Sequence, residues 1–209
     1  MAQLEAEPRE YRLRDGTPVL VRAILPEDKA RLQAGLRRMS EQSRYYRFMS
    51  YVNRLSDAQL RYLTEIDYVN HLAWIALDPS EPDFPVLGVA RCIRIEGEPD
   101  AAEAAVAVVD SHHGRGLGTL LLGLLAGAAS RSGIRRFRAH VLADNVAMLH
   151  LFRDLGAAIE PEDATVRLVD MAIPEDPRDL PDTAAGRVFR AVARQELSFP
   201  HPKFHEPEE

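Results

Sequence analysis

The sequence predicts an α/β fold, in which a mixed and mostly antiparallel sheet is flanked by helices in three layers. Two observations support this prediction. Short apolar runs that are typical of strands alternate with longer runs that are typical of helices, and a glycine-rich turn joins one strand to a leucine-rich helix. The chain has 209 residues, of which 46% are hydrophobic and 28% charged, so it can form both a buried core and a polar surface.

The individual elements follow from local patterns. Pro26 with two acids behind it, and the capping box from Ser56 to Gln59, mark helix starts, while Gly133 and Gly156 mark helix ends. We expect strands at 19–23, 71–78, 86–96, 103–109, 136–142 and 166–173, with a short one at Ile159. We expect helices at 26–39, 56–66, 117–132, 146–155 and 183–197.

Domain limits follow from composition. Residues 19–174 form the expected domain, after an N-terminal extension at 1–18. Residues 175–209 form an acidic, proline-rich C-terminal extension that contains the last helix, and its end, HPKFHEPEE, is expected to be a disordered tail.

Charge and cysteine content exclude several classes of protein. The net charge of −6 argues against a nucleic-acid partner. No uncharged apolar run reaches 18 residues and the N-terminus has no apolar signal-peptide core, so we expect no membrane partner. The single cysteine, Cys92, excludes an internal disulfide and a cysteine-based metal cluster, and its alternating strand predicts a buried core residue. We therefore expect a cytoplasmic protein without a metal.

The stretch VVDSHHGRGLGT, residues 108–119, carries an apolar strand through a glycine-rich turn into a helix. Free N–H groups and the positive end of the helix dipole attract anions there, and glycine lets a phosphate touch the backbone. The dinucleotide fingerprint does not fit, because Leu121 or Thr119 falls where glycine or alanine is required, and the Walker lysine is absent. A tight turn that binds nothing is the alternative.

The spacing His113-x-x-Gly116-x-Gly118 resembles the acyl-CoA-binding motif Gln/Arg-x-x-Gly-x-Gly/Ala of the GNAT superfamily of N-acetyltransferases. The segment DNVA at 144–147, followed by LFRDLG at 151–156, resembles the family's next motif. Within the family, four stretches are similar to bacterial protein lysine acetyltransferases. They are YRLRDG at 11–16, SRYYRF at 43–48, DYVNH at 67–71 and AEAAVAV at 102–108.

This resemblance implies a GNAT (acyl-CoA N-acyltransferase) fold with acetyl-CoA as co-substrate and a primary amine as acceptor. The favoured acceptor is a protein lysine, for example on an acyl-CoA synthetase. The bacterial protein lysine acetyltransferases often carry a fused regulatory domain, and we expect a freestanding catalytic domain here. The resemblance also implies that the backbone of Val106 and Val108 pairs with pantetheine. The remaining CoA-binding residues would be His113, Gly114, Arg115, Gly116, Gly118, Thr119 and Asn145.

Acetyl transfer to an amine needs a base, because a free lysine has a pKa of about 10.4. Glu103 is the candidate: it opens an otherwise apolar strand, where proton affinity rises, and it matches the glutamate base in the AEAAVAV stretch. His71, expected beside the acceptor pocket, is a second catalytic candidate, although a structural histidine is the commoner case. SRYYRF is expected to pack on the glycine turn or to line the acceptor groove. We expect direct transfer in a ternary complex, without an acetyl-cysteine.

Two positions depart from the family pattern. His113 stands where Gln or Arg is usual, and Phe152 stands where many members have the tyrosine that protonates the leaving thiolate. Two other functions therefore stay open: acetylation of a small-molecule amine, and a non-catalytic acyl-CoA-binding regulator.

Overall fold

An eight-stranded sheet runs through the molecule in the order β1-β2-β3-β4-β5-β6-β8-β7. The structure is a computed structural model, and it describes residues 8–196, with the side chains of 8–193. The strands are β1 (Arg9–Arg12), β2 (Pro18–Ala23), β3 (His71–Leu77), β4 (Val86–Ile95), β5 (Glu98–Val108), β6 (Arg136–Leu142), β7 (Ala158–Pro161) and β8 (Val166–Ala172). All neighbouring pairs are antiparallel except β5 and β6, which are parallel.

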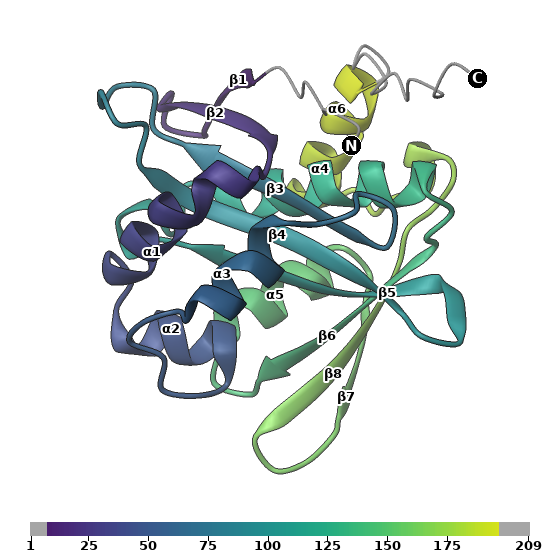
Figure 1. The fold of residues 1–209 in the computed structure, drawn as a ribbon. Coiled ribbons are helices and arrows are strands. Elements are labelled where there is room, and N and C mark those ends of the chain that lie inside the picture. Colours follow the sequence, from purple (N-terminus) through teal and green to yellow (C-terminus); the bar gives the residue numbers. More distant parts are fainter. Residues whose placement is uncertain (1–7, 197–209) are drawn as a thin grey trace, which may run out of the picture.

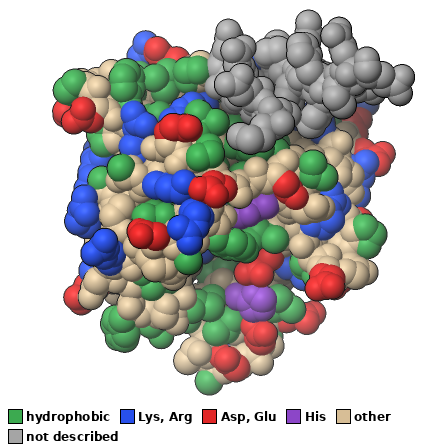
Figure 2. Space-filling model, viewed as in Figure 1, with side chains coloured by type: hydrophobic (Ala, Val, Ile, Leu, Met, Phe, Trp, Pro, Cys, Tyr) green, Lys and Arg blue, Asp and Glu red, His purple; other side chains and the backbone are tan. Residues whose placement is uncertain are grey.

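Helices cover both faces of the sheet (Figure 1). The helices are α1 (Lys29–Arg37), α2 (Glu41–Phe48), α3 (Asp57–Thr64), α4 (Leu117–Arg131), α5 (Val146–Asp154) and α6 (Ala184–Glu196). The first three lie on one face, which we call the front, while α4 and α5 lie on the other and α6 packs on α4. Figure 2 shows the front face, with basic side chains gathered toward α1 and acidic and histidine side chains over the β7–β8 hairpin.

The core is built around α4. Its leucines at 117, 121, 122, 124 and 125 are at most 1% exposed, because the helix is apolar nearly all round and packs between the sheet and α6. Gly123 makes the second contact possible, since the ring of Phe189 on α6 would lie 3.2 Å from any Cβ added there. A second, smaller core lies under the front helices, around Ile24, Leu32 and Ile75.

Strands β5 and β6 diverge along their length. They pair over three residue pairs only, from Ala101↔Arg136 to Glu103↔Arg138. Beyond Glu103 the two strands separate into a V, and Figure 1 shows them meeting at one end and spreading apart at the other. Within this V, the facing edges of β5 and β6 form no strand pairing with each other.

Most of the expected elements are present, and the expected three-layer arrangement of a mixed sheet between helices is confirmed. The capping box at Ser56 is confirmed, since the Ser56 hydroxyl accepts from Gln59 N at 3.2 Å and the Gln59 side chain accepts from Ser56 N at 2.8 Å. The proline-rich stretch after Ile173 leads into α6 as expected, whereas the tail beyond Glu196 and the first seven residues lie outside the described residues.

Two elements were not expected. Strand β1 lies within the segment assigned to an N-terminal extension, and it pairs with β2 at the sheet edge. Its sequence, REYR, lacks an apolar run because only one of its faces meets the core. Helix α2 has a mostly polar sequence, EQSRYYRF, and depends on its Ser40 cap and on tertiary contacts. Strand β5 also begins earlier than expected, at Glu98.

Among residues 8–196, no helix combines the length and apolar character that crossing a bilayer requires.

Candidate active site

The V between β5 and β6 leaves part of the β5 edge without a strand partner. Val109 N donates to Leu87 O at 2.9 Å, so Val109 belongs to a hydrogen-bonded pair with β4. Because such pairs alternate along an antiparallel ladder, Val106 and Val108 turn their N–H and C=O groups the other way, toward β6. Pairing to β6 among the described residues ends at Glu103, so these groups have no strand partner.

The glycine turn opens α4 with free backbone donors. Gly114 and Gly116 have φ values of 72° and 89°, a conformation that glycine adopts without strain, which explains two of the glycines in the motif. Gly116 is the N-cap and the first helical bond runs from Leu120 N to its carbonyl. The N–H groups of residues 117–119 therefore have no intrahelical acceptor and lie at the positive end of the dipole.

The β1–β2 turn holds the glycine turn in place. Arg14 N donates to Arg115 O at 3.2 Å, and the Arg115 guanidinium pairs with Asp15 at 3.3 Å. The Arg14 side chain lies against Gly116, where an added Cβ would come within 3.3 Å of it. The segment expected to be an extension thus positions the turn expected to bind phosphate.

The two histidines of the turn have different roles in the structure. His113 is exposed, and its ring donates from Nε2 to Val108 O at 2.9 Å, which leaves the Val108 N–H toward the V. His112 is buried beside Ser111, 3.0 Å from the hydroxyl, and burial together with the charge of Arg115 lowers its pKa. His112 is therefore neutral at pH 7, and His113 caps the strand end.

On the other side of the V, Asn145 begins α5. Its side chain accepts from Met148 N at 3.2 Å, which fixes the start of this helix. Tyr46 on α2 donates to the backbone carbonyl of Asp144 at 3.2 Å, so the front helices reach across to this loop. Phe152 is 2% exposed and belongs to the core, so no hydroxyl stands at that position.

Glu103 lies in the middle of β5 on the front face. Its neighbours Ala102 and Ala104 are 0% and 4% exposed and point to the back of the sheet, so alternation directs the Glu103 side chain the other way. The expectation that Glu103 opens its strand is wrong, because β5 begins at Glu98. Glu103 does lie between buried positions, as expected, while its own side chain is exposed.

His71 on β3 lies level with Glu103 across the sheet, with β4 between their two strands. The register runs from His71 to Ile93 on β4 and then to Glu103, so their backbones are about 10 Å apart. His71 Nε2 lies 3.0 Å from Arg91 Nη1. Arginine only donates, so Nε2 accepts and the proton is on Nδ1. Burial and the charge of Arg91 lower the pKa of His71 to about 4, which makes it neutral.

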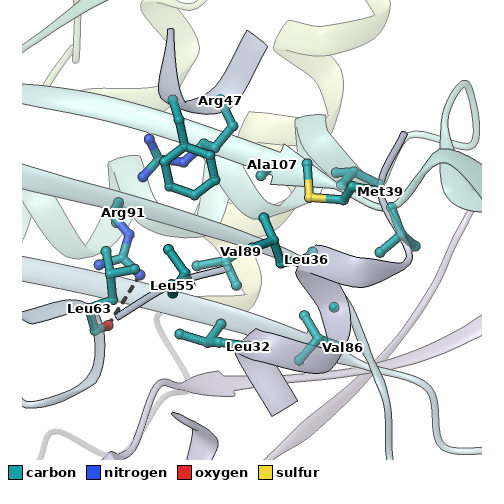
Figure 3. Close-up of a pocket in the computed structure, with 15 residues that line it drawn as sticks. Leu32, Leu36, Met39, Arg47, Leu55, Leu63, Val86, Val89, Arg91 and Ala107 are labelled. Atoms are coloured by element: carbon teal, nitrogen blue, oxygen red, sulfur yellow. Dashed lines mark hydrogen bonds between the residues drawn. The ribbon is translucent and has the colours of Figure 1, made fainter. Parts of the chain in front are cut away.

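A largely apolar cavity of about 70 Å³ lies beneath the front helices, next to β4 and the end of β5 (Figure 3). Its walls include Leu36 and Met39 from the end of α1, Leu55 and Leu63 around α3, and Val89 from β4. Arg47, Phe48 and Arg91 also line it, so the SRYYRF stretch contributes to the cavity wall.

Helix α2 is tied to the strand end that enters the glycine turn. Asp110 accepts from Ser40 N at 2.7 Å, from Ser40 Oγ at 2.6 Å and from Ser43 Oγ at 2.8 Å. Burial alone would raise the pKa of Asp110, but these hydrogen bonds together lower it, so the carboxylate is ionised. Asp110 therefore connects the helix that lines the cavity to the start of the glycine turn.

Arg91 and Asp110 were not predicted from the sequence, and Arg47 was included only through the expectation for SRYYRF. Arg47 and Arg91 come from segments far apart in the chain, and only the packing of α2 on β5, the neighbour of β4 in the sheet, brings them together. The one sign of this site in the sequence is the pair of arginines within SRYYRF, which was interpreted as groove lining.

Cys92 is confirmed as a core residue, with 0% exposure, and burial raises the pKa of its thiol to about 12. Within the described part of the chain, no three His, Cys, Asp or Glu side chains are grouped to hold a metal ion.

Comparisons with known proteins agree with this geometry. The model of the acetyltransferase (GNAT) family matches residues 36–157. Acetyltransferase Pat from Mycolicibacterium smegmatis is 35% identical over 167 residues, which are 80% of this chain and 49% of that protein, so the chain spans about half of its length. Acetyltransferase PA5475 from Pseudomonas aeruginosa is 32% identical over 169 residues, covering 78% of this chain and 89% of that protein.

A solved structure shows the same fold. The GNAT domain of S. lividans PAT superposes with a TM-score of 0.72 at 32% identity, covering 79% of this chain and 96% of that one. The family match includes β5 and β6, which form the V, together with the glycine turn and the start of α5. The chain is therefore a member of the acetyltransferase (GNAT) family.

Proposed function

We propose that this protein transfers an acetyl group from acetyl-CoA to a protein lysine, by direct attack within a ternary complex. The observation that carries the proposal is the V between β5 and β6, which opens beside the free N-terminus of α4. An extended, amide-containing chain that ends in a pyrophosphate fits such a site. Its amides would pair with the strand edge and its phosphates with the helix N-terminus.

In this proposal the pantetheine lies along Val106 and Val108. The pyrophosphate is held by the turn at 113–116 and by the N–H groups of Gly118 and Thr119. Asn145 contacts CoA from the start of α5. The Val108 N–H, which the His113 ring leaves free toward the V, polarises the thioester carbonyl and stabilises the oxyanion.

The chemical step joins the amine nitrogen to the acetyl carbon and breaks the carbon–sulfur bond. Glu103 takes the proton from the amine, directly or through a water. Phe152 has no proton to give, so CoA leaves as a thiolate that is protonated by solvent. Cys92 takes no part, because its thiol is buried on the back of the sheet, whereas Glu103 faces the front.

Exposure of Glu103 supports a macromolecular acceptor. A base at the surface meets a lysine that projects from another protein, whereas a small amine is better held in an enclosed site. Two aromatic side chains near this region are also open to solvent, Tyr62 at 58% and Tyr51 at 85%. The similarity to bacterial protein lysine acetyltransferases points the same way.

His71 is better placed to position Arg91 than to carry protons. Its Nε2 lone pair accepts the Arg91 hydrogen bond, and its pKa of about 4 makes it a weak base. We therefore assign the proton transfer to Glu103 alone.

The test is release of CoA from acetyl-CoA by the wild type and by Glu103→Gln. Each is given two acceptor pools, the protein fraction of a cell lysate and its small-molecule filtrate. We expect release with the protein pool, and a 10²- to 10⁴-fold loss in Glu103→Gln, the usual contribution of a general base. Glu96→Gln, an exposed glutamate in the β4–β5 turn, is the matched control and should keep full activity.

The other outcomes reject parts of the proposal. Release with the filtrate alone would move the acceptor to a small amine. Full activity in Glu103→Gln would remove the base assignment. Acetyl-CoA binding without turnover in either pool would favour a non-catalytic regulator.

A further inference from the structure

Two arginines line one end of the cavity, away from Met39 (Figure 3). Arg91 on β4 is 5% exposed, and Arg47 near the end of α2 is half-buried. Burial and the nearby charge of Arg47 together lower the pKa of Arg91 to about 9. Two like charges that face one apolar cavity repel each other, so the arrangement favours an anion between them.

None of the described residues supplies a paired anion. Arg91 donates from Nη1 to His71 and from Nη2 to Leu63 O at 3.2 Å, and neither acceptor is charged. Arg47 lies over the ring of Phe48, 5.1 Å from its centroid, and makes no hydrogen bond or ion pair within residues 8–193. Burial lowers the pKa of Arg47, and attraction to the Glu103 carboxylate offsets part of this effect without contact.

Arg91 is held in a fixed orientation. His71 and the Leu63 carbonyl each hold one nitrogen of Arg91, so its planar fork cannot rotate freely. Asp67 forms no ion pair with Arg91, and its carboxylate instead accepts from the backbone N–H groups of residues 69–71 at 2.8–2.9 Å. A guanidinium fork that is oriented in advance matches the two oxygens of a carboxylate.

The arginine pair lies close to the base. Arg91 is opposite Ala105 in the β4–β5 ladder, and Glu103 is two residues further along β5 on the same face. Such diagonal neighbours are about 7–8 Å apart, a distance that one substrate can span.

We propose that Arg47 and Arg91 form a carboxylate-binding subsite for the acceptor, filled by an aspartate or glutamate side chain next to the target lysine. This inference rests on the proposed function and adds the substrate class. The acidic side chain docks between the guanidiniums while the lysine amine reaches Glu103. The enzyme would therefore acetylate lysines that have acidic neighbours faster than other lysines.

The experiment uses two peptide libraries with a central lysine and random outer positions, one with Glu and the other with Gln on both sides of the lysine. Initial rates with acetyl-CoA are compared. We expect the wild type to prefer the Glu library by about 10- to 100-fold, the contribution of charge-assisted hydrogen bonds. In Arg47→Gln this ratio should fall toward one. Arg91→Lys, which retains the charge but not the fork, should give an intermediate ratio.

Arg37→Gln is the matched control, because Arg37 is an exposed arginine on α1 outside the cavity wall. It should keep the wild-type ratio. Equal rates for both libraries in the wild type, or an unchanged ratio in Arg47→Gln, would overturn the proposal.

A third arm locates the carboxylate. The Gln library is supplied with acetyl-CoA or with succinyl-CoA, whose acyl chain ends in a carboxylate. A preference for succinyl-CoA that depends on Arg47, without a preference for Glu, would assign the arginines to the acyl group and overturn the acceptor assignment.

A binding measurement distinguishes failure of the subsite from failure of the proposed function. If neither library is acetylated, binding of fluorescent libraries to the protein with acetyl-CoA is measured by anisotropy. Tighter binding of the Glu library that is lost in Arg47→Gln would support the subsite even so, whereas equal binding of both libraries would overturn it.

Discussion

At the scale of the residue, His71 makes stability depend on pH. Its pKa is about 4 in the folded protein, below the ordinary value of 6.5, so between these two pH values the unfolded chain binds a proton that the folded chain does not. Its stabilising contribution is present at pH 7 and decreases as the pH falls through this window. By linkage, the loss between pH 7 and pH 5 is about 2 kcal/mol.

Urea unfolding of the wild type and of His71→Gln at pH 7 and pH 5 tests this prediction. Glutamine does not titrate, and its oxygen can still accept from Arg91. The acid-sensitive carboxylates elsewhere are shared by both proteins, so the wild type should lose about 2 kcal/mol more than the variant between the two pH values. An equal loss in both proteins would show that His71 is not buried in neutral form.

At the scale of the element, alanine substitutions at the two ends of α4 distinguish the effect of backbone strain from an effect on ligand binding. Gly116 begins α4 and Gly133 follows its end, with φ values of 89° and 79°. Alanine at either position costs about 1–2 kcal/mol of stability through strain. An added Cβ at Gly133 meets nothing within 4 Å, whereas at Gly116 it meets Arg14 in the turn proposed to hold pyrophosphate.

We therefore expect Gly116→Ala to weaken acetyl-CoA binding by about tenfold or more, the equivalent of at least one lost hydrogen bond to phosphate. Gly133→Ala should be destabilised to a similar degree and bind normally. Calorimetric titration with acetyl-CoA, beside urea unfolding, provides both readings. Equal affinities in the two variants would mean that the turn does not contact the ligand.

At the scale of the whole molecule, α6 belongs to the core rather than to an appended tail. Phe189 is 5% exposed and packs on Gly123 of α4. Truncating a buried phenylalanine typically costs 3–5 kcal/mol, so Phe189→Ala should lower the free energy of unfolding by about this amount. In Arg187→Ala, which removes an ion pair whose side chains are 61% and 83% exposed, the loss should be below about 1 kcal/mol. Similar urea midpoints for the two variants would contradict this role of α6.

Much of the fold was predictable because its determinants are local. Glycines at helix ends, the capping box at Ser56 and the alternation of apolar residues all act within a few positions. Strand β1 lacks such a pattern, because it is polar and lies at a sheet edge. Helix α2 has a local cap at Ser40 but no apolar periodicity, and it is held by Asp110 from a distant segment. The arginine subsite was hidden for the same reason, since Arg47 and Arg91 meet only after α2 packs against the sheet.

The hydrogen bond and the ion pair between the β1–β2 turn and the glycine turn have a mechanical consequence. The chain enters the fold at β1, and only a short hairpin separates that entry point from Arg14, Asp15 and the loop they hold. Force or torque applied at β1 would be transmitted through this hairpin, which includes the buried Leu13, to the loop. Any partner or covalently linked module that pulls on this end would therefore act on the loop that we propose holds the pyrophosphate of acetyl-CoA.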